Sequence, residues 1–387
     1  MNDYKRLGDY IREVNVRNRE LEVKKLVGLT IDKGFIPSVA NVIGTDLSNY
    51  KIIQKEQFAC SLMQVSRDGK MPVAMFEEDQ AIMSPAYPMF EVIDKTVLLP
   101  QYLMMWFSRS EFDREASYYA VGGVRGSLTW EDFCNMRLPI PSIERQREIV
   151  AKYETLTRRI RLNEQIIQNL ESTAQTLYCK MFVDGIDKEN LPEGWKIGTL
   201  GEVCSKIGSG ATPKGGKDSY TNDGVSFIRS MNIFDFSFCY DELAHISDKQ
   251  AKSLDSVMVK ERDILFNITG ASVTRCCMVP NNVLPARVNQ HVMILRSKEY
   301  IMSYYLLCLL CSDESKRSLL GMSQSGSTRE AITKSEIESF NIVIPAMELL
   351  KEYDNNIKII ILQTDLYKQE NSKLIELQSL LLAKMGR

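Results

Sequence analysis

Several features of membrane proteins and metal enzymes are missing from this sequence. The 387 residues include only two histidines, His245 and His291, and no run of about 18 apolar residues that could cross a membrane. The N-terminus lacks the apolar segment of a secretory signal. Nine cysteines, an odd number without framework spacing, favour a reducing compartment; Cys308 and Cys311 are spaced C-x-x-C but lie in an apolar segment. We therefore expect a cytoplasmic protein without a membrane segment or a metal site.

The motifs of common catalytic sites are also missing. Lys217 follows a glycine-rich stretch, but Ala211 stands where a P-loop has its first glycine and Asp218 follows the lysine. There is no Asn-Pro-Pro or Asp-Pro-Pro sequence of an amino-methyltransferase, and no G-x-S-x-G, H-E-x-x-H or paired C-x-x-C pattern. The sequence therefore predicts no catalytic residue. An enzyme whose site is assembled from distant parts of the chain stays an alternative.

The composition is that of an ordinary globular protein, with 44% hydrophobic and 25% charged residues. The formal net charge is −2, so the chain lacks the overall basicity of a simple nucleic-acid binder. Binding requires a basic face and not a basic total, so the charge does not exclude a DNA-binding function.

The most regular feature is the stretch 143–181, where apolar residues recur at alternating steps of four and three, with Asn163 as the polar exception. Such spacing is typical of a helix that faces another helix, and an asparagine within it sets the register. At 1.5 Å per residue this helix would be roughly 58 Å long. A generic dimerisation coil is one interpretation of the pattern.

The same pattern returns 204 positions later, where 129–141 aligns with 333–345 and Lys180-Met181 with Lys384-Met385. The chain is therefore predicted to contain two units, each a globular part followed by a long helix. A connector of roughly a dozen residues spans at most about 43 Å, too short to return along the first helix. We expect an intramolecular antiparallel coiled coil with pseudo-two-fold symmetry. Its predicted seam residues are Ile149, Tyr153, Leu156, Ile160, Asn163, Ile167, Leu170, Leu177, Ile357, Ile360, Leu374 and Leu381.

The predicted fold class is α+β, with two tandem mixed domains. Helices are expected at 100–117 and 301–320, and the strands of the second domain include 225–233 and 263–268. The expected boundaries are a first domain at 1–141, a spacer helix at 142–186, a second domain at 187–345 and a second spacer helix at 346–387.

Short strings occur in the same order as in a known family. They include Ser209-Gly-Ala-Thr-Pro213, Phe227-Ile-Arg-Ser230, Asp263-Ile-Leu-Phe266 and Ile342-Val-Ile-Pro345, which leads into the second long helix. With the duplicated architecture, the whole chain resembles the DNA-specificity (S) subunit of Type I restriction–modification enzymes. The first half lacks the Ser-Gly-x-Thr-Pro and Phe-Ile-Arg-Ser strings, so no contact residue is transferred to it from the family.

The resemblance implies two target-recognition domains that bind a bipartite, asymmetric sequence in double-stranded DNA. The helices would act as spacer and as docking surface for two methyltransferase (M) subunits and, through them, restriction (R) subunits. S-adenosylmethionine, ATP and Mg would be bound only by those partners. A homodimer in isolation, a reading segment detached from a single-chain restriction enzyme, and a scaffold for proteins alone stay open.

Candidate DNA contacts are the basic, hydroxyl and amide side chains in glycine-rich loops and at strand ends, since these groups read base edges and bind phosphates. In the first domain they are Arg12, Arg17, Arg19, Arg125 and Ser127. In the second domain they are Ser209, Thr212, Lys214, Lys217, Arg229, Asn232, Arg275, Arg287, Asn289, Gln290, Ser327 and Arg329. Each loop has the alternative interpretation of a plain turn or connector, and each arginine that of an ion-paired surface residue.

Overall fold

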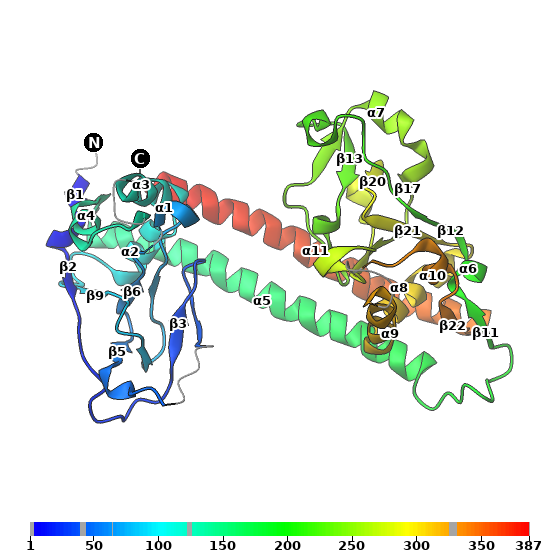
Figure 1. Ribbon diagram of the computed structural model, residues 1–387, viewed down its shortest axis with the longest axis horizontal. Coiled ribbons are helices and arrows are strands. Elements are labelled where there is room, and N and C mark those ends of the chain that lie inside the picture. Colours follow the sequence, from blue (N-terminus) through cyan, green and yellow to red (C-terminus); the bar gives the residue numbers. More distant parts are fainter. Residues whose placement is uncertain (1–3, 39–43, 64, 122–125, 325–330, 387) are drawn as a thin grey trace. The chain divides into compact units, whose positions relative to one another are not determined.

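The structure is a computed structural model that describes residues 4–38, 44–63, 65–121, 126–324 and 331–386 (Figure 1). The chain divides into two compact units: unit 1 contains Met1–Arg161 with Lys373–Arg387, and unit 2 contains Leu162–Ser372. Two long helices, α5 (Ile143–Phe182) and α11 (Met347–Lys384), each contribute one part to unit 1 and the other part to unit 2. No helix in the described part of the chain is long and apolar enough to cross a membrane.

Unit 1 is built on a four-stranded antiparallel sheet. Its strands, in order across the sheet, are β2 (Ile11–Glu13), β9 (Met89–Val92), β6 (Phe58–Cys60) and β7 (Val73–Met75). The helices are α1 (Val65–Asp68), α2 (Pro100–Phe107), α3 (Ser110–Ala120) and α4 (Trp130–Asn135). Three two-stranded pairs complete the unit: β1 (Tyr4–Arg6) with β10 (Arg137–Pro139), β3 (Val27–Leu29) with β4 (Phe35–Pro37), and β5 (Lys51–Gln54) with β8 (Gln80–Met83). Phe58, Phe90 and Phe107 lie at the centre of the core between sheet and helices.

Unit 2 contains two four-stranded sheets. The first has the order β12 (Cys204–Ser209), β21 (Val292–Ser297), β18 (Ile264–Asn267), β19 (Cys276–Met278) and is antiparallel. The second has the order β16 (Ala244–Ile246), β13 (Val225–Ile228), β20 (Ala286–Val288), β17 (Met258–Val259), with β13 and β20 parallel. Two short pairs are β11 (Lys196–Thr199) with β22 (Asn341–Ile344), and β14 (Ile233–Phe234) with β15 (Ser237–Phe238). The helices are α6 (Leu200–Val203), α7 (Asp248–Ser253), α8 (Ser303–Cys311), α9 (Asp313–Gln324) and α10 (Lys334–Glu338).

The two long helices contact each other inside each unit. In unit 1, the Gln378 amide donates to the Thr157 hydroxyl at 2.7 Å. In unit 2, Asn163 Nδ2 donates to Asn371 Oδ1 at 2.8 Å, and Lys368 on α11 donates to Glu171 on α5 at 2.7 Å. Higher numbers on α5 pair with lower numbers on α11, so the contacting segments run antiparallel in unit 2. All twelve predicted seam residues are buried or half-buried.

The predicted α+β architecture, with two mixed domains that are each followed by a long helix, is confirmed. The helices predicted at 100–117 and 301–320 are each interrupted, at Ser108-Arg109 and at Ser312. The Ser108 hydroxyl donates to a carbonyl of α2, and the Ser312 hydroxyl donates to a carbonyl of α8. Serine competes in this way with helical backbone bonding, so each interruption has a local cause.

Each unit has its own polar anchor on a long helix. In unit 1, the fully buried Gln146 of α5 accepts a bond from the backbone and donates to the backbone of loop 97–99, at 2.9 and 2.8 Å. In unit 2, the Arg262 guanidinium donates to both carboxylate oxygens of Asp354 on α11. Two tyrosine rings lie 3.8 and 4.3 Å from that guanidinium. Both groups of the ion pair are buried, so breaking it would leave an unpaired charge inside the unit.

Candidate nucleic-acid interface

One edge of unit 2 gathers the ends of strands from both large sheets. The turn 289–291 links β20 of the second sheet to β21 of the first. Around it, backbone N–H groups donate across segments: Asn289 to β13, Ile268 to the turn itself, and Gly210 to β21, at 2.9–3.1 Å. We call the turn, with the loops that follow β12, β13 and β18, the junction edge. Loops that a rigid scaffold positions often carry binding residues, which makes this edge a candidate site.

A chain of side-chain hydrogen bonds crosses the junction edge. The Thr212 hydroxyl donates to Oε1 of Gln290. Nε2 of Gln290 lies 3.1 Å from Nε2 of His291, and Nδ1 of His291 lies 2.8 Å from the Thr269 hydroxyl oxygen. Asn289 supports the turn by accepting the backbone N–H of His291 at 3.1 Å. Thr212 and Gln290 are exposed, so this polar cluster faces solvent.

Gly210 explains why the loop after β12 can lie against the turn. A Cβ at this position would stand 2.0 Å from the carbonyl oxygen of Val288 and 2.2 Å from that of Asn289. Any side chain would therefore push the loop outward, and Thr212 would move away from Gln290. The glycine of the Ser-Gly-Ala-Thr-Pro string is thus required by a close backbone approach.

The other candidates of unit 2 with accessible side chains are cations and one hydroxyl. Ser209, Lys214 and Lys217 are exposed in or beside the loop after β12. Arg275 is half-buried and stacks on Phe234, with its guanidinium carbon 4.8 Å from the ring centroid. These residues supply positive charge and hydrogen-bond donors near the ends of β12 and β18, as phosphate contacts require.

Three candidates are engaged inside unit 2. Asn232 is fully buried and donates to two backbone carbonyls of the segment 239–241. Arg287 is 6% exposed and bonds to Asp255 at 2.6 Å and to the Ala251 carbonyl. The Arg229 side chain is 16% exposed and donates to the Glu242 carbonyl. We therefore leave Asn232 and Arg287 out of the proposed surface and regard Arg229 as a residue of its border.

The described candidates of unit 1 each have separate surroundings. Arg12 bonds to Glu91 of the neighbouring strand at 2.6 Å, Arg17 donates to the carbonyl of Asn49, and Arg19 is exposed. Ser127 is half-buried, beside a backbone bond of 2.9 Å between Leu128 N–H and the carbonyl of residue 62, just after β6. Three further candidates lie outside the described residues, namely Arg125, Ser327 and Arg329.

Residues that the sequence did not single out also lie at these edges. Thr269 and His291 complete the polar cluster of unit 2, and in unit 1 the Ser66 hydroxyl donates to the Gly126 carbonyl at 3.4 Å. The partners of Thr269 and Ser66 are distant in sequence, so no local pattern marks either residue.

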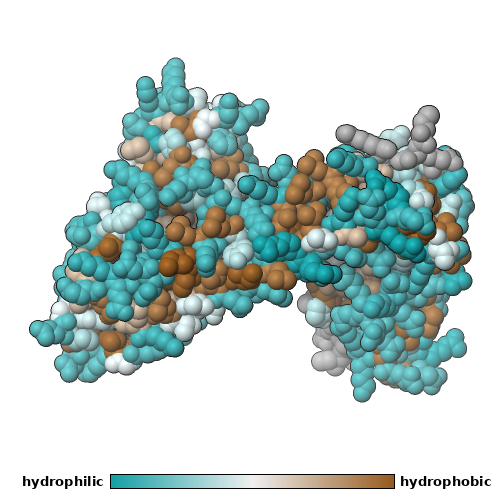
Figure 2. Space-filling model, turned by 180° about the vertical axis from the view of Figure 1, so that it is seen from behind, coloured by the Kyte–Doolittle hydropathy of each residue, from teal (hydrophilic) through white to brown (hydrophobic). Residues whose placement is uncertain are grey.

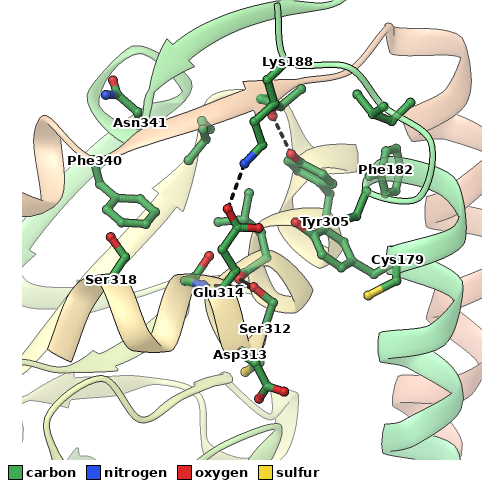
Figure 3. Close-up of a pocket in the computed structure, with 18 of the residues that line it drawn as sticks. Cys179, Phe182, Lys188, Tyr305, Ser312, Asp313, Glu314, Ser318, Phe340 and Asn341 are labelled. Atoms are coloured by element: carbon green, nitrogen blue, oxygen red, sulfur yellow. Dashed lines mark hydrogen bonds and ion pairs between the residues drawn. The ribbon is translucent and has the colours of Figure 1, made fainter. Parts of the chain in front are cut away.

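A cavity of about 630 Å³ in unit 2 is the first competing site (Figure 3). Aromatic side chains line it, including Phe182, Tyr305 and Phe340, and Lys188 at its rim pairs with Glu314 at 2.8 Å. Its lining residues include no histidine. Glu314, one of the two carboxylates in the lining, is held in its ion pair with Lys188, and we assign no chemistry to this cavity.

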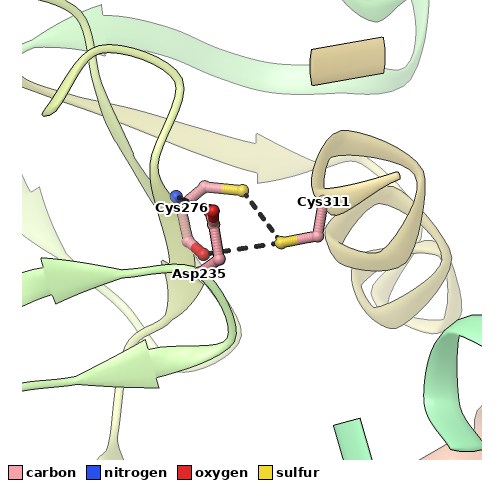
Figure 4. Close-up of side chains that lie close together, drawn as sticks. All are labelled: Asp235, Cys276 and Cys311. Atoms are coloured by element: carbon pink, nitrogen blue, oxygen red, sulfur yellow. Dashed lines mark hydrogen bonds between the residues drawn. The ribbon is translucent and has the colours of Figure 1, made fainter. Parts of the chain in front are cut away.

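A second competing site is the group of Asp235, Cys276 and Cys311, whose potential ligand atoms lie within 4.8 Å of one another (Figure 4). The two sulfur atoms are 3.4 Å apart. However, the Lys316 ammonium stands 2.5 Å from the Asp235 carboxylate, and burial raises the pKa of the Cys311 thiol well above its ordinary value. A metal requires the thiolate form, so this arrangement favours a packed, ion-paired group over a metal centre.

Comparison with known proteins decides the family. The family model described as the Type I restriction modification DNA specificity domain matches residues 14–172 and again 192–376. The chain belongs to this family. Among curated relatives, the specificity subunit is similar to the putative type I restriction enzyme MjaX specificity subunit of Methanocaldococcus jannaschii, with 21% identity over 83% of this chain and 75% of the relative. It is also similar to the type I restriction enzyme HindI specificity subunit of Haemophilus influenzae, with 19% identity over 79% of this chain and 81% of the relative.

A solved structure shares the fold of the specificity subunit. The Type I restriction–modification S subunit from M. genitalium aligns with a TM-score of 0.59 at 13% identity, over 100% of this chain and 96% of that chain. The family membership confirms the prediction of a non-catalytic specificity subunit.

Proposed function

We propose that this specificity subunit acts in the cytoplasm as the sequence-reading part of a Type I restriction–modification complex and binds a bipartite, asymmetric target in double-stranded DNA. The observation that carries the proposal is the double family match, since each match covers one mixed domain and part of the long helix that follows it. Each domain would read one half-site. The string Ser209-Gly-Ala-Thr-Pro213, which is part of the junction edge of unit 2, does not occur in 1–141, so the half-sites would differ.

The chemistry of the exposed candidates supports base reading. Base edges in the major groove are distinguished by amide, hydroxyl and basic side chains, and Gln290, Thr212 and Arg275 are of these types. The proposed recognition domains are 1–141 and 187–345, with spacer helices at 142–186 and 346–387. Two readers on a fixed helical spacer would contact half-sites about one helical turn apart.

The test is to express the chain with its methyltransferase subunit in a host that lacks other adenine methylation, and to map methylated adenines across the genome. We expect one motif with two unlike specific parts and a spacer of constant length. A single continuous motif, a palindrome, or methylation without sequence preference would contradict the proposal.

The proposal includes docking of two methyltransferase subunits on the long helices and of restriction subunits through them. These partners would supply the sites for S-adenosylmethionine, ATP and Mg. Hydrophobic side chains are visible on the surface where the long helices run (Figure 2). On α11, Ile359, Leu362 and Leu366 in unit 2 are 61%, 48% and 63% exposed. Their spacing of three and four places them on one helical face, outside the seam, where a partner helix could cover them.

Co-purification tests the docking surface. The double substitution Leu362→Glu with Leu366→Glu should prevent capture of the methyltransferase subunit, because it would bury two charges in an apolar contact. Ser372→Glu adds one charge at an exposed position of the same helix, roughly 80–120° around it from Leu362 and Leu366, and it is the control that should leave capture unchanged. Normal capture by the double variant would place the docking surface elsewhere.

A further inference from the structure

The side-chain hydrogen bonds of the junction edge hold the exposed Gln290 amide through both its oxygen and its nitrogen. Oε1 of Gln290 accepts from Thr212, and Nε2 of Gln290 lies within hydrogen-bond distance of the His291 ring. An amide nitrogen only donates, so His291 Nε2 accepts, and the ring proton is on Nδ1, from which it is donated to Thr269. Each of the four side chains thereby takes part in at least one hydrogen bond of the chain.

Each atom of the Gln290 amide uses only one of its two bonding positions in this chain. One N–H and one oxygen lone pair of this exposed residue are left for a ligand. A donor beside an acceptor at amide spacing is the arrangement that pairs with N7 and N6 of adenine in the major groove.

We propose that Gln290 is a specificity-determining residue that reads an A·T pair in the half-site of unit 2, and that Thr212 and His291 are positioning residues that fix its amide. This inference rests on the proposed function, namely that unit 2 reads DNA. Holding a flexible side chain before binding reduces the conformational entropy that is lost on binding. Fixing the amide also sets which side of the base pair receives the donor.

The backbone around the Gln290 amide also helps to fix its position. Turn 289–291 is bonded to β13 and to the loop after β18. Gly210 brings the Thr212 loop into contact with the carbonyls of Val288 and Asn289. The Ser-Gly-Ala-Thr-Pro string therefore has a role beyond turning the chain, because it places the hydroxyl that orients Gln290.

The experiment uses the full chain in complex with its methyltransferase subunit. Duplexes carry each of the four base pairs at every position of the second half-site, and binding is measured by competition. The wild-type complex should prefer A·T at one position. Gln290→Ala should reduce the preference at that position alone, by about 5- to 150-fold. Gln290→Glu keeps the shape but removes the donor, and it should shift the preference there towards cytosine.

Substitutions at Thr212 test the positioning role. Thr212→Val, which keeps the shape without the hydroxyl, should reduce discrimination at the same position by about 2- to 12-fold. Thr212→Ser, which keeps the hydroxyl, should discriminate at that position as the wild-type chain does. Lys252 is an exposed residue of α7 that takes no part in the polar cluster, and Lys252→Ala serves as the control.

The outcomes separate this inference from the function on which it rests. If the wild-type complex shows no second half-site, the proposed function fails. If the second half-site is present and Gln290→Ala changes no position, or weakens binding to all duplexes alike, the assignment of Gln290 is overturned. If Thr212→Val and Thr212→Ser behave alike, the positioning role of Thr212 is overturned.

Discussion

The two units share one structural frame, an antiparallel four-stranded sheet, and differ in the strands that are added to it. The sheet order β2-β9-β6-β7 of unit 1 corresponds to β12-β21-β18-β19 of unit 2, and both sheets are antiparallel. Corresponding hydrogen bonds also recur. Tyr102 on α2 donates its hydroxyl to the carbonyl of Pro139 in β10, and Tyr305 on α8 donates to the carbonyl of Val343 in β22. The frame is therefore a true repeat at the level of individual bonds.

The added parts are not alike. Unit 2 carries a complete second sheet, β16-β13-β20-β17, whereas unit 1 has the two-stranded pairs β3-β4 and β5-β8. In unit 2 the second sheet ends at the junction edge, where Gln290 lies. A constant frame that holds variable additions would let each domain change its DNA sequence without changing how it is attached to the long helices.

Domain exchange is the strongest test of this comparison. Replacing residues 1–141 by the first domain of another specificity subunit should replace one half-site entirely and leave the other intact, because the frames fold around separate cores. Mapping methylated adenines measures the outcome. A change in both half-sites would show that the two readers are not independent.

The anchors of the two units should differ in the cost of removal. Arg262→Ala leaves the Asp354 carboxylate buried without its partner, which typically costs about 3–5 kcal/mol. Gln146→Ala in unit 1 leaves neutral backbone groups unpaired, at about 1–3 kcal/mol. Hydrogen–deuterium exchange by mass spectrometry, compared peptide by peptide, assigns each loss to its unit. The control Arg145→Ala breaks an exposed pair with Glu148, and little change is expected. Equal losses for Arg262→Ala and Arg145→Ala would contradict this reasoning.

Two glycines of unit 2 offer a further test of how the two half-sites are read. Gly210→Ala should cost about 1–3 kcal/mol because a Cβ collides with backbone oxygens. It should also weaken selectivity for the second half-site and spare the first. Gly208→Ala is the matched control, since nothing lies within 4 Å of its Cβ. Thermal unfolding and the competition assay measure both effects, and identical behaviour of the two variants would argue against the close approach.

The smallest effect is expected at Arg12 of unit 1. Its ion pair with Glu91 is largely exposed on the arginine side, so Arg12→Ala should change the free energy of unfolding by only about 0–1 kcal/mol. If Arg12 contacts a phosphate, the slope of DNA affinity against salt concentration should fall by about one unit for all sequences. An unchanged slope would remove Arg12 from the proposed interface.

The sequence predicted the repeated long helices and the mixed domains, because heptad spacing and internal alignment are local or periodic signals. It did not predict the second sheet of unit 2. There β13 and β20 pair in parallel although almost sixty residues separate them. Arg287 looked like a DNA contact because a buried arginine paired with Asp255 has the same appearance in sequence as a surface one. His291 joins its turn to Thr269 through a long-range bond, which no spacing rule detects.

The division of the long helices between the units has a consequence for biosynthesis. The core of unit 1 includes Met385, and the hydroxyl of Tyr4 bonds to the carbonyl of Gly386. A ribosome therefore releases the last component of the first-made domain only after all of unit 2 has been translated. The half that emerges first is the half that is completed last, and a chain that stopped near residue 372 would lack the segment Lys373–Arg387 of unit 1.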